Sequence, residues 1–106
     1  MAKYLVEFDY TPDGLQGVLK EGGSKRRQAI EQLAKSLGGK LEAFYFSFGD
    51  HDGLVIWDMP DNVSSAAAAL LVNASGAAKV KTVVLLTPEE LDQATKKVGD
   101  YRPPGK

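Results

Sequence analysis

The chain has 106 residues, with 13 basic and 14 acidic side chains, one histidine and no cysteine. This balance lacks the basic excess of nucleic-acid-binding proteins, and the absence of cysteine excludes disulfides, thiolate catalysis and cysteine-ligated metal centres. The length fits a single domain over residues 1–106, and no signal-like or membrane-spanning apolar stretch precedes the first strand-like run, so we expect a cytoplasmic protein.

The periodicity of apolar residues predicts four strands, three helices and one long loop. The strands show alternation or β-branched runs, and the helices have apolar residues at helical spacing. The loop contains four glycines and Pro12, with space for a helical turn near residues 15–19. In chain order, these segments are residues 3–10 (strand), 11–23 (loop), 24–37 (helix), 41–48 and 54–57 (strands), 64–75 (helix), 80–86 (strand) and 88–98 (helix).

Residues that favour helix starts precede each predicted helix. Ser24 is the expected N-cap of the first helix, and Asp61 or Asn62 that of the second. Thr87, followed by a proline and by Glu90, has the pattern of a capping box. The three helices therefore have defined beginnings, and residues 100–106 form a tail that contains proline and glycine.

The order β-α-β-β-α-β predicts an α+β, ferredoxin-like fold, in which two helices cover one face of a four-stranded antiparallel sheet. The first two strands are apolar on both faces, because Leu5, Ala43 and Tyr45 oppose the rows expected in the core. The helix-free face therefore needs a cover. We expect a second copy of the chain to provide it, in a homodimer or higher homo-oligomer with a pocket within or beside the interface.

The turn between the second and third strands holds the best candidate for chemistry. Asp50, His51 and Asp52 stand between Gly49 and Gly53, and glycine tolerates the positive φ of tight reversals. A carboxylate beside the imidazole would orient it and raise its pKa, as acid–base catalysis requires. The alternative, which turn chemistry favours, is a polar turn in which Asp52 caps backbone N–H groups and His51 is solvated. No metal-ligand spacing is visible, so we expect no metal.

A second candidate site lies at the start of the first helix. Ser24, Lys25, Arg26 and Arg27 follow a glycine pair, where free backbone N–H groups and the helix dipole favour an anion. Three cations at this end are unfavourable for the helix itself, which points to an anionic ligand. The alternative is that these cations pair with nearby glutamates. The spacing is not that of a P-loop.

Three further residues are candidates for lining a ligand pocket. Tyr45 and Trp57 carry rings with a polar atom, although core or interface packing is the more common role of such residues. Asn73 lies among apolar residues of the second helix, and either bonds a backbone group in the core or lines a pocket.

Several segments together resemble the GYD-domain proteins, a bacterial family named for a Gly-Tyr-Asp signature. They are residues 10–14, 19–23, 37–45 and 86–90, and the signature falls on Gly49, position 51 and Asp52, with His51 in place of tyrosine. The resemblance implies the fold of the dimeric α+β barrel group. That group includes haem-degrading and cofactor-free oxygenases, isomerases and ligand-sensing domains.

We therefore expect an oligomeric module that binds a small molecule or anion, in a regulatory role, with no cofactor and with neither nucleic acid nor membrane as partner. The alternative is a small cofactor-free or haem-dependent oxygenase or isomerase that uses His51, with Asp50 or Asp52, in a pocket beside the sheet. The absence of a complete catalytic set favours the binding module.

Overall fold

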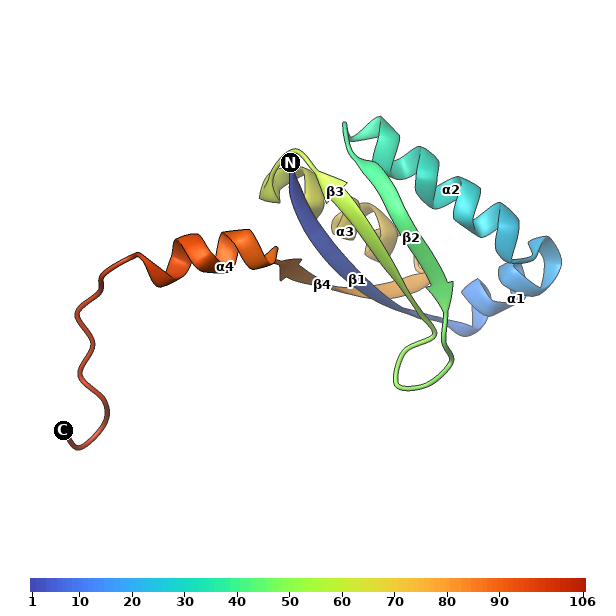
Figure 1. The fold of residues 1–106 in the computed structure, drawn as a ribbon. Helices are drawn as coiled ribbons and strands as arrows, with labels where there is room; N and C mark the ends of the chain where they lie inside the picture. Colours follow the sequence, from blue (N-terminus) through green and yellow to red (C-terminus); the bar gives the residue numbers. More distant parts are fainter.

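The computed structural model describes all 106 residues and contains four strands and four helices (Figure 1). In chain order they are β1 (Ala2–Tyr10), α1 (Pro12–Glu21), α2 (Gly23–Ser36), β2 (Lys40–Phe46), β3 (Gly53–Met59), α3 (Asn62–Ala74), β4 (Ala78–Leu85) and α4 (Pro88–Thr95). The strands form one sheet in the order β2-β3-β1-β4, and every neighbouring pair is antiparallel. This confirms the α+β, ferredoxin-like arrangement. None of the helices combines the length and the hydropathy needed to cross a bilayer.

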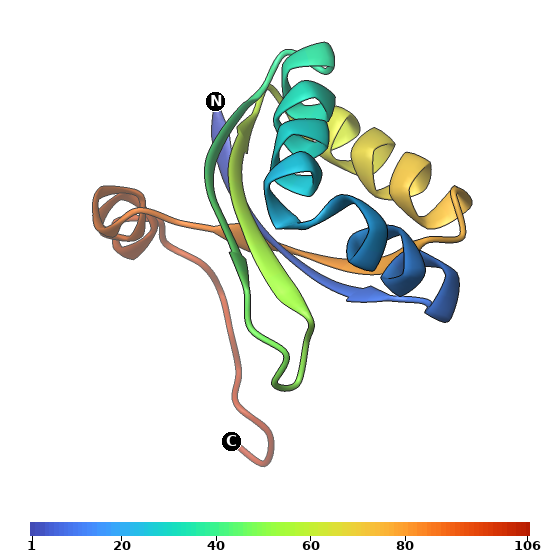
Figure 2. The same cartoon turned by 90° about the vertical axis from the view of Figure 1, so that its right-hand side faces the viewer.

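Helices α1, α2 and α3 all lie on one face of the sheet, and the other face has no helix packed on it (Figure 2). The core forms where alternate residues of β1 and β3 point at these helices. Its buried members are Tyr4, Val6, Phe8, Val55, Trp57 and Met59 from the strands, and Ala34 and Ala68 from the helices. The remaining alternate positions of β1 and β3 therefore face the helix-free side.

The prediction of a long loop over residues 11–23 is wrong, because most of it is α1; the helical turn expected near residues 15–19 is part of this longer helix. The Thr11 hydroxyl accepts a hydrogen bond from the backbone N–H of Gly14 at 3.1 Å, and Pro12 occupies the first turn. This capping outweighs the low helix propensity of the glycines. Gly14 is buried, and a Cβ there would lie 1.9 Å from the carbonyl oxygen of Ala77, so glycine lets α1 approach the start of β4.

The other helix starts are a mixture of confirmed and wrong predictions. Asp61 caps α3 through Ser64 N, and Thr87 and Glu90 form the predicted capping box of α4. Ser24, however, is not an N-cap. Helix α2 begins one residue earlier, and its N-cap is Gly22, which has a φ of 83° and no side chain to bond the helix.

Helix α4 and the tail stand away from the body of the domain (Figures 1 and 2). In Figure 2 they lie beyond the sheet on the side opposite α1 to α3. The apolar side chains Leu91 and Val98 are 56% and 98% exposed. Helix α4 therefore lacks a packing partner within its own chain. An eight-residue helix without tertiary packing is only marginally stable in water.

Candidate functional site

The helix-free face carries a charged cluster at the end where β1 finishes. Glu7 and Asp9 alternate with the buried residues of β1, and Lys81 and Lys79 of β4 stand directly opposite them in the antiparallel register. Side chains at paired positions share a face. Two carboxylates and two ammonium groups therefore gather on the helix-free side, beside the β2–β3 turn.

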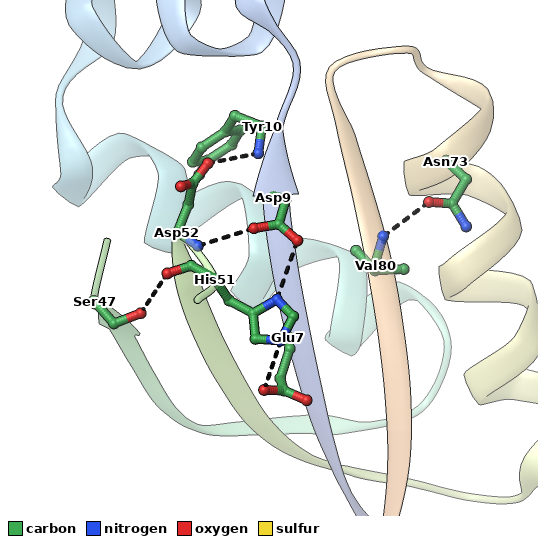
Figure 3. Close-up of polar contacts among 8 residues, drawn as sticks. All are labelled: Glu7, Asp9, Tyr10, Ser47, His51, Asp52, Asn73 and Val80. Carbon is green, nitrogen blue, oxygen red and sulfur yellow. Dashed lines mark hydrogen bonds and ion pairs between the residues drawn. The ribbon is translucent and has the colours of Figure 1, made fainter. Parts of the chain in front are cut away.

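That turn is held against β1 by hydrogen bonds donated from both segments, one by β1 and one by the turn (Figure 3). The backbone N–H of Tyr10 donates to Oδ2 of Asp52 at 2.8 Å, and the backbone N–H of Asp52 donates to Oδ1 of Asp9 at 3.2 Å. Within the turn, the Ser47 hydroxyl donates to the carbonyl oxygen of His51 at 2.8 Å. Asp52 thus caps a backbone N–H group, as the polar-turn reading expects.

His51 lies between two carboxylates of β1. Its Nδ1 is 3.1 Å from Oδ2 of Asp9, and its Nε2 is 3.1 Å from Oε2 of Glu7. The hydrogen bond with Asp9 is the main cause that raises the pKa of His51, and Glu7 adds to it. The same bond lowers the pKa of Asp9. At 24% side-chain exposure, the ring is neither buried nor freely solvated.

This arrangement constrains the chemistry of His51. Its partners are Glu7 and Asp9, whereas Asp50, proposed beside it, is exposed and forms neither an ion pair nor a hydrogen bond with the ring. Both ring nitrogens lie within hydrogen-bond distance of a carboxylate, so the imidazole, when protonated, donates from both and has no lone pair for general-base catalysis. The two carboxylates flank opposite edges of the ring, and no group of three or more possible metal ligands is present.

The two glycines of the turn have a different role from the predicted one. Neither Gly49 nor Gly53 has a positive φ; the left-handed residue is Phe48, with a φ of 53°. Gly53 is buried instead, and a Cβ there would come within 2.6 Å of the carbonyl oxygen of Tyr45. It is required by close packing rather than by backbone conformation.

A second candidate site lies on the opposite, helical side of the sheet. An outer cleft of about 350 Å³ opens between α1, α2 and α3, and beside it is an inner cavity of about 40 Å³. Five residues line both spaces, so the cavity forms the floor of the cleft; they are Tyr10, Arg26, Ile30, Val72 and Ala78. The inner cavity is otherwise lined by apolar and aromatic core side chains, among them Trp57. A mostly apolar concave space with few polar groups is typical of small-molecule sites.

Arg26 is the cation of this cleft. It is half-buried, and none of the ion pairs in the structure involves it. Burial raises the pKa of the neighbouring Tyr10 hydroxyl, and Arg26 acts on that pKa in the opposite direction. Two carboxylates of α1, Asp13 and Glu21, also line the outer cleft.

Trp57 also borders the inner cavity, but its indole N–H is buried among protein atoms. The residue is 3% exposed, and its Nε1 has no hydrogen-bond partner in the protein. Buried N–H groups are nearly always paired, so an unpaired one calls for an explanation.

The remaining predicted site residues do not converge on one place. Ser24 and Arg27 border a shallow depression with Phe44 and Phe46, and Arg27 pairs with Glu31 at 3.6 Å, as the alternative reading expected. Lys25 is exposed. Tyr45 is 66% exposed on the helix-free face. Asn73 accepts a hydrogen bond from the backbone N–H of Val80 at 3.0 Å, which tethers β4 to α3 (Figure 3).

Sequence reasoning missed Glu7, Asp9 and Tyr10. The alternation of β1 already placed both carboxylates on the face opposite the core, and this was the available signal. Nothing in the sequence alone indicated that the β2–β3 turn folds back over the end of that strand.

The fold and the two candidate sites define a small ferredoxin-like α+β domain with one covered and one uncovered sheet face. The family model of the GYD domain matches residues 4–95, and the chain belongs to that family. No curated protein and no solved structure matches it.

Proposed function

We propose that the protein binds a small monoanion with an apolar body in the cleft between α1, α2 and α3. The observation that carries this proposal is Arg26, a half-buried guanidinium without a carboxylate partner that lines both the outer cleft and the inner cavity. Partial burial of an unpaired charge is unfavourable, and an anionic ligand offsets that cost through charge-assisted hydrogen bonds.

The charges around the cleft restrict the kind of anion. Asp13 and Glu21 line the same space as Arg26, and their repulsion grows with the negative charge of the ligand, so it disfavours a phosphate ester more than a monoanion. The largely apolar lining favours a hydrocarbon body over a sugar. A carboxylic acid of modest size fits both conditions, and a ligand-binding or regulatory role is consistent with it.

Calorimetric titration of hexanoate, benzoate and inorganic phosphate into the full chain tests this proposal. We expect the carboxylates to bind and phosphate not to bind. Arg26→Gln should weaken carboxylate binding roughly ten- to a hundredfold, as expected for a hydrogen bond to a charged group. Arg27→Gln is the matched control, because Arg27 pairs with Glu31 outside the cleft. The proposal would be contradicted if both variants lost the same carboxylate affinity. It would also be contradicted if the native chain bound the carboxylates too weakly to detect at millimolar concentration.

The enzymatic alternative rests on His51, and the geometry supports it less. Both ring nitrogens face carboxylates, and the ring lines neither the outer cleft nor the inner cavity. General base catalysis would require the ring to leave one partner. A haem titration is a direct test of the haem-dependent version, which predicts a Soret shift that disappears in His51→Ala.

We also propose that two copies of the chain associate through the helix-free face. The middle of this face is an apolar patch formed by Leu5, Ala43, Tyr45, Leu54, Ile56 and Val83, which we call the open-face patch. Charges stand at both ends: the cluster around His51, and Lys3 with Glu42 and Asp58 at 2.8 and 3.1 Å. An apolar centre between charged ends is typical of protein interfaces.

Light scattering on the full chain tests this association. Tyr45 and Val83 are 66% and 43% exposed in the monomer, so Tyr45→Glu/Val83→Glu should leave the fold intact and abolish association. Val63→Glu, at a 78% exposed position of α3, is the control and should associate like the native chain. A native chain that stays monomeric when concentrated would contradict this proposal without affecting ligand binding.

A further inference from the structure

Strand β4 is an edge strand, and a side chain blocks its outer edge at Val80. On its inner side β4 pairs with β1, whereas the backbone N–H of Val80 points outward and donates to Oδ1 of Asn73 at 3.0 Å. Backbone groups alternate in direction along an antiparallel strand, so the N–H and C=O groups of Thr82 and Val84 point outward as well. No loop or side chain accepts a hydrogen bond from either of these N–H groups.

The side chains along this open part of the edge are mostly apolar. Val83, Val84 and Leu86 are 43%, 58% and 60% exposed. Residues 82–86 include neither a charged residue nor a proline, which are the usual means by which an exposed edge avoids pairing. An edge of this composition is suited to pairing with a further strand.

We propose that β4 pairs with β4 of a second copy of the chain, antiparallel across a two-fold axis at Val84. In this register Val84 exchanges both backbone hydrogen bonds with its own counterpart, and Thr82 does so with Leu86 of the other copy. The pairing uses the free outward groups and ends at Val80, which Asn73 already occupies. A register centred on Thr82 would instead require the N–H of Val80.

The charges beyond the paired segment favour a second copy over an unrelated strand. Pairing at the edge extends the sheet, so α4 of the second copy stays on the helix-free side, where it lies in its own chain (Figure 2). There it passes the start of β4, which carries Lys79 and Lys81 on that face, and neither lysine forms an ion pair within the chain. The first turn of α4 carries Glu89 and Glu90. The acidic start of each α4 therefore faces the basic start of the other β4.

This contact is separate from the proposed association of open faces, because it joins the edges of two sheets rather than their surfaces. Val83 belongs to both contacts, so Tyr45→Glu/Val83→Glu should disrupt both. Tyr45 lies on β2 at the other edge of the sheet, so Tyr45→Glu alone should disrupt only the open-face contact.

Opposite charges at the two-fold axis test the edge pairing on the full chain, in variants that also carry Tyr45→Glu. Because Val84 faces its own counterpart, Val84→Lys and Val84→Glu should each be repelled by a copy of itself, whereas a mixture of the two should associate. With one variant labelled with ¹⁵N, native mass spectrometry should find mixed pairs roughly tenfold in excess of either like pair. Val63→Lys and Val63→Glu, at an exposed position of α3, are the matched control and should show no such preference.

Hydrogen exchange of the native chain gives a readout that needs no variant. The Val84 amide should exchange at least about tenfold more slowly in concentrated than in dilute protein, because only the pair provides it with an acceptor. An exchange rate at Val84 that is independent of concentration, or equal amounts of mixed and like pairs, would overturn the edge pairing and leave the open-face association in place. If Tyr45→Glu does not weaken association while Val84 stays protected, the edge pairing is supported and the open-face association fails.

Discussion

Nδ1 of His51 lies 3.1 Å from Oδ2 of Asp9, across 42 positions of sequence, and this contact joins the β2–β3 turn to the end of β1. It perturbs both groups in the direction that favours their charged forms, since it raises the pKa of His51 and lowers the pKa of Asp9. The contact therefore makes the stability of the fold depend on pH in a definite direction.

For His51, a folded-state pKa above the ordinary 6.5 means that the contribution to stability is full below that pH and is lost as the pH rises through the raised value. For Asp9, the folded-state pKa lies below 3.8, so its contribution is present above that pH and is lost on further acidification. Both contributions are present between about pH 4 and 6.5. The melting temperature of the native chain should exceed that of His51→Gln by more at about pH 5 than at about pH 9. Asp50→Asn, at the exposed neighbour, should show no such dependence. If the difference in melting temperature between the native chain and His51→Gln is the same at both pH values, the ion pairs of His51 contribute nothing to stability.

Gly53→Ala should destabilise the fold by about 1–3 kcal/mol, the usual cost of overpacking. The new Cβ would meet Cζ of Phe8 at 2.3 Å and the carbonyl oxygen of Tyr45 at 2.6 Å, and that backbone atom belongs to a paired strand. Gly49→Ala, in the same turn, meets nothing within 4 Å and should stay within about 0.5 kcal/mol of the native chain. Urea unfolding measures the free energy of unfolding of both variants. Similar losses of stability would show that the turn as a whole is sensitive to substitution, rather than the close contact at Gly53.

Alanine substitutions at two glycines of α1 should change the stability of the fold in opposite directions. Gly17→Ala meets nothing within 4 Å and should stabilise the chain by up to about 1 kcal/mol through helix propensity. Gly14→Ala drives a Cβ to 1.9 Å from the Ala77 carbonyl oxygen and should destabilise it by about 1–3 kcal/mol or more. Chemical denaturation compares the pair directly. Stabilisation by Gly14→Ala would contradict the close approach of α1 to β4.

Asn73→Ala should cost about 0.5–1.5 kcal/mol, since the N–H of Val80 on an edge strand loses its side-chain partner. Asn73→Asp retains an acceptor oxygen at that position and should recover most of the loss. Thermal unfolding of the two variants, together with hydrogen exchange of the Val80 amide, checks the prediction. An exchange rate at Val80 that is the same in Asn73→Ala as in the native chain would show that the bond contributes nothing.

Local sequence patterns predicted some helix starts correctly and missed others. The Thr-Pro pair at Thr87 led to a correct prediction of α4, because the cap and the capping box are made by residues three apart. The same pair at Thr11 was overlooked, because the glycines that follow it suggested a loop. Gly14 is needed because α1 packs closely against Ala77, which is far away in the sequence. Helix propensities of the neighbouring residues carry no information on that contact.

Alternation along the strands and caps at the helix ends depend on neighbours in sequence, so the amino-acid order by itself determined the ferredoxin-like fold, the buried row of β1 and the apolar face left without helices. Only the tertiary structure decided that Glu7 and Asp9 enclose His51, and that Tyr10 and Arg26 border one cleft. These groups come from separate elements, and they meet because sheet register and helix packing bring distant positions together, which no spacing along the chain records.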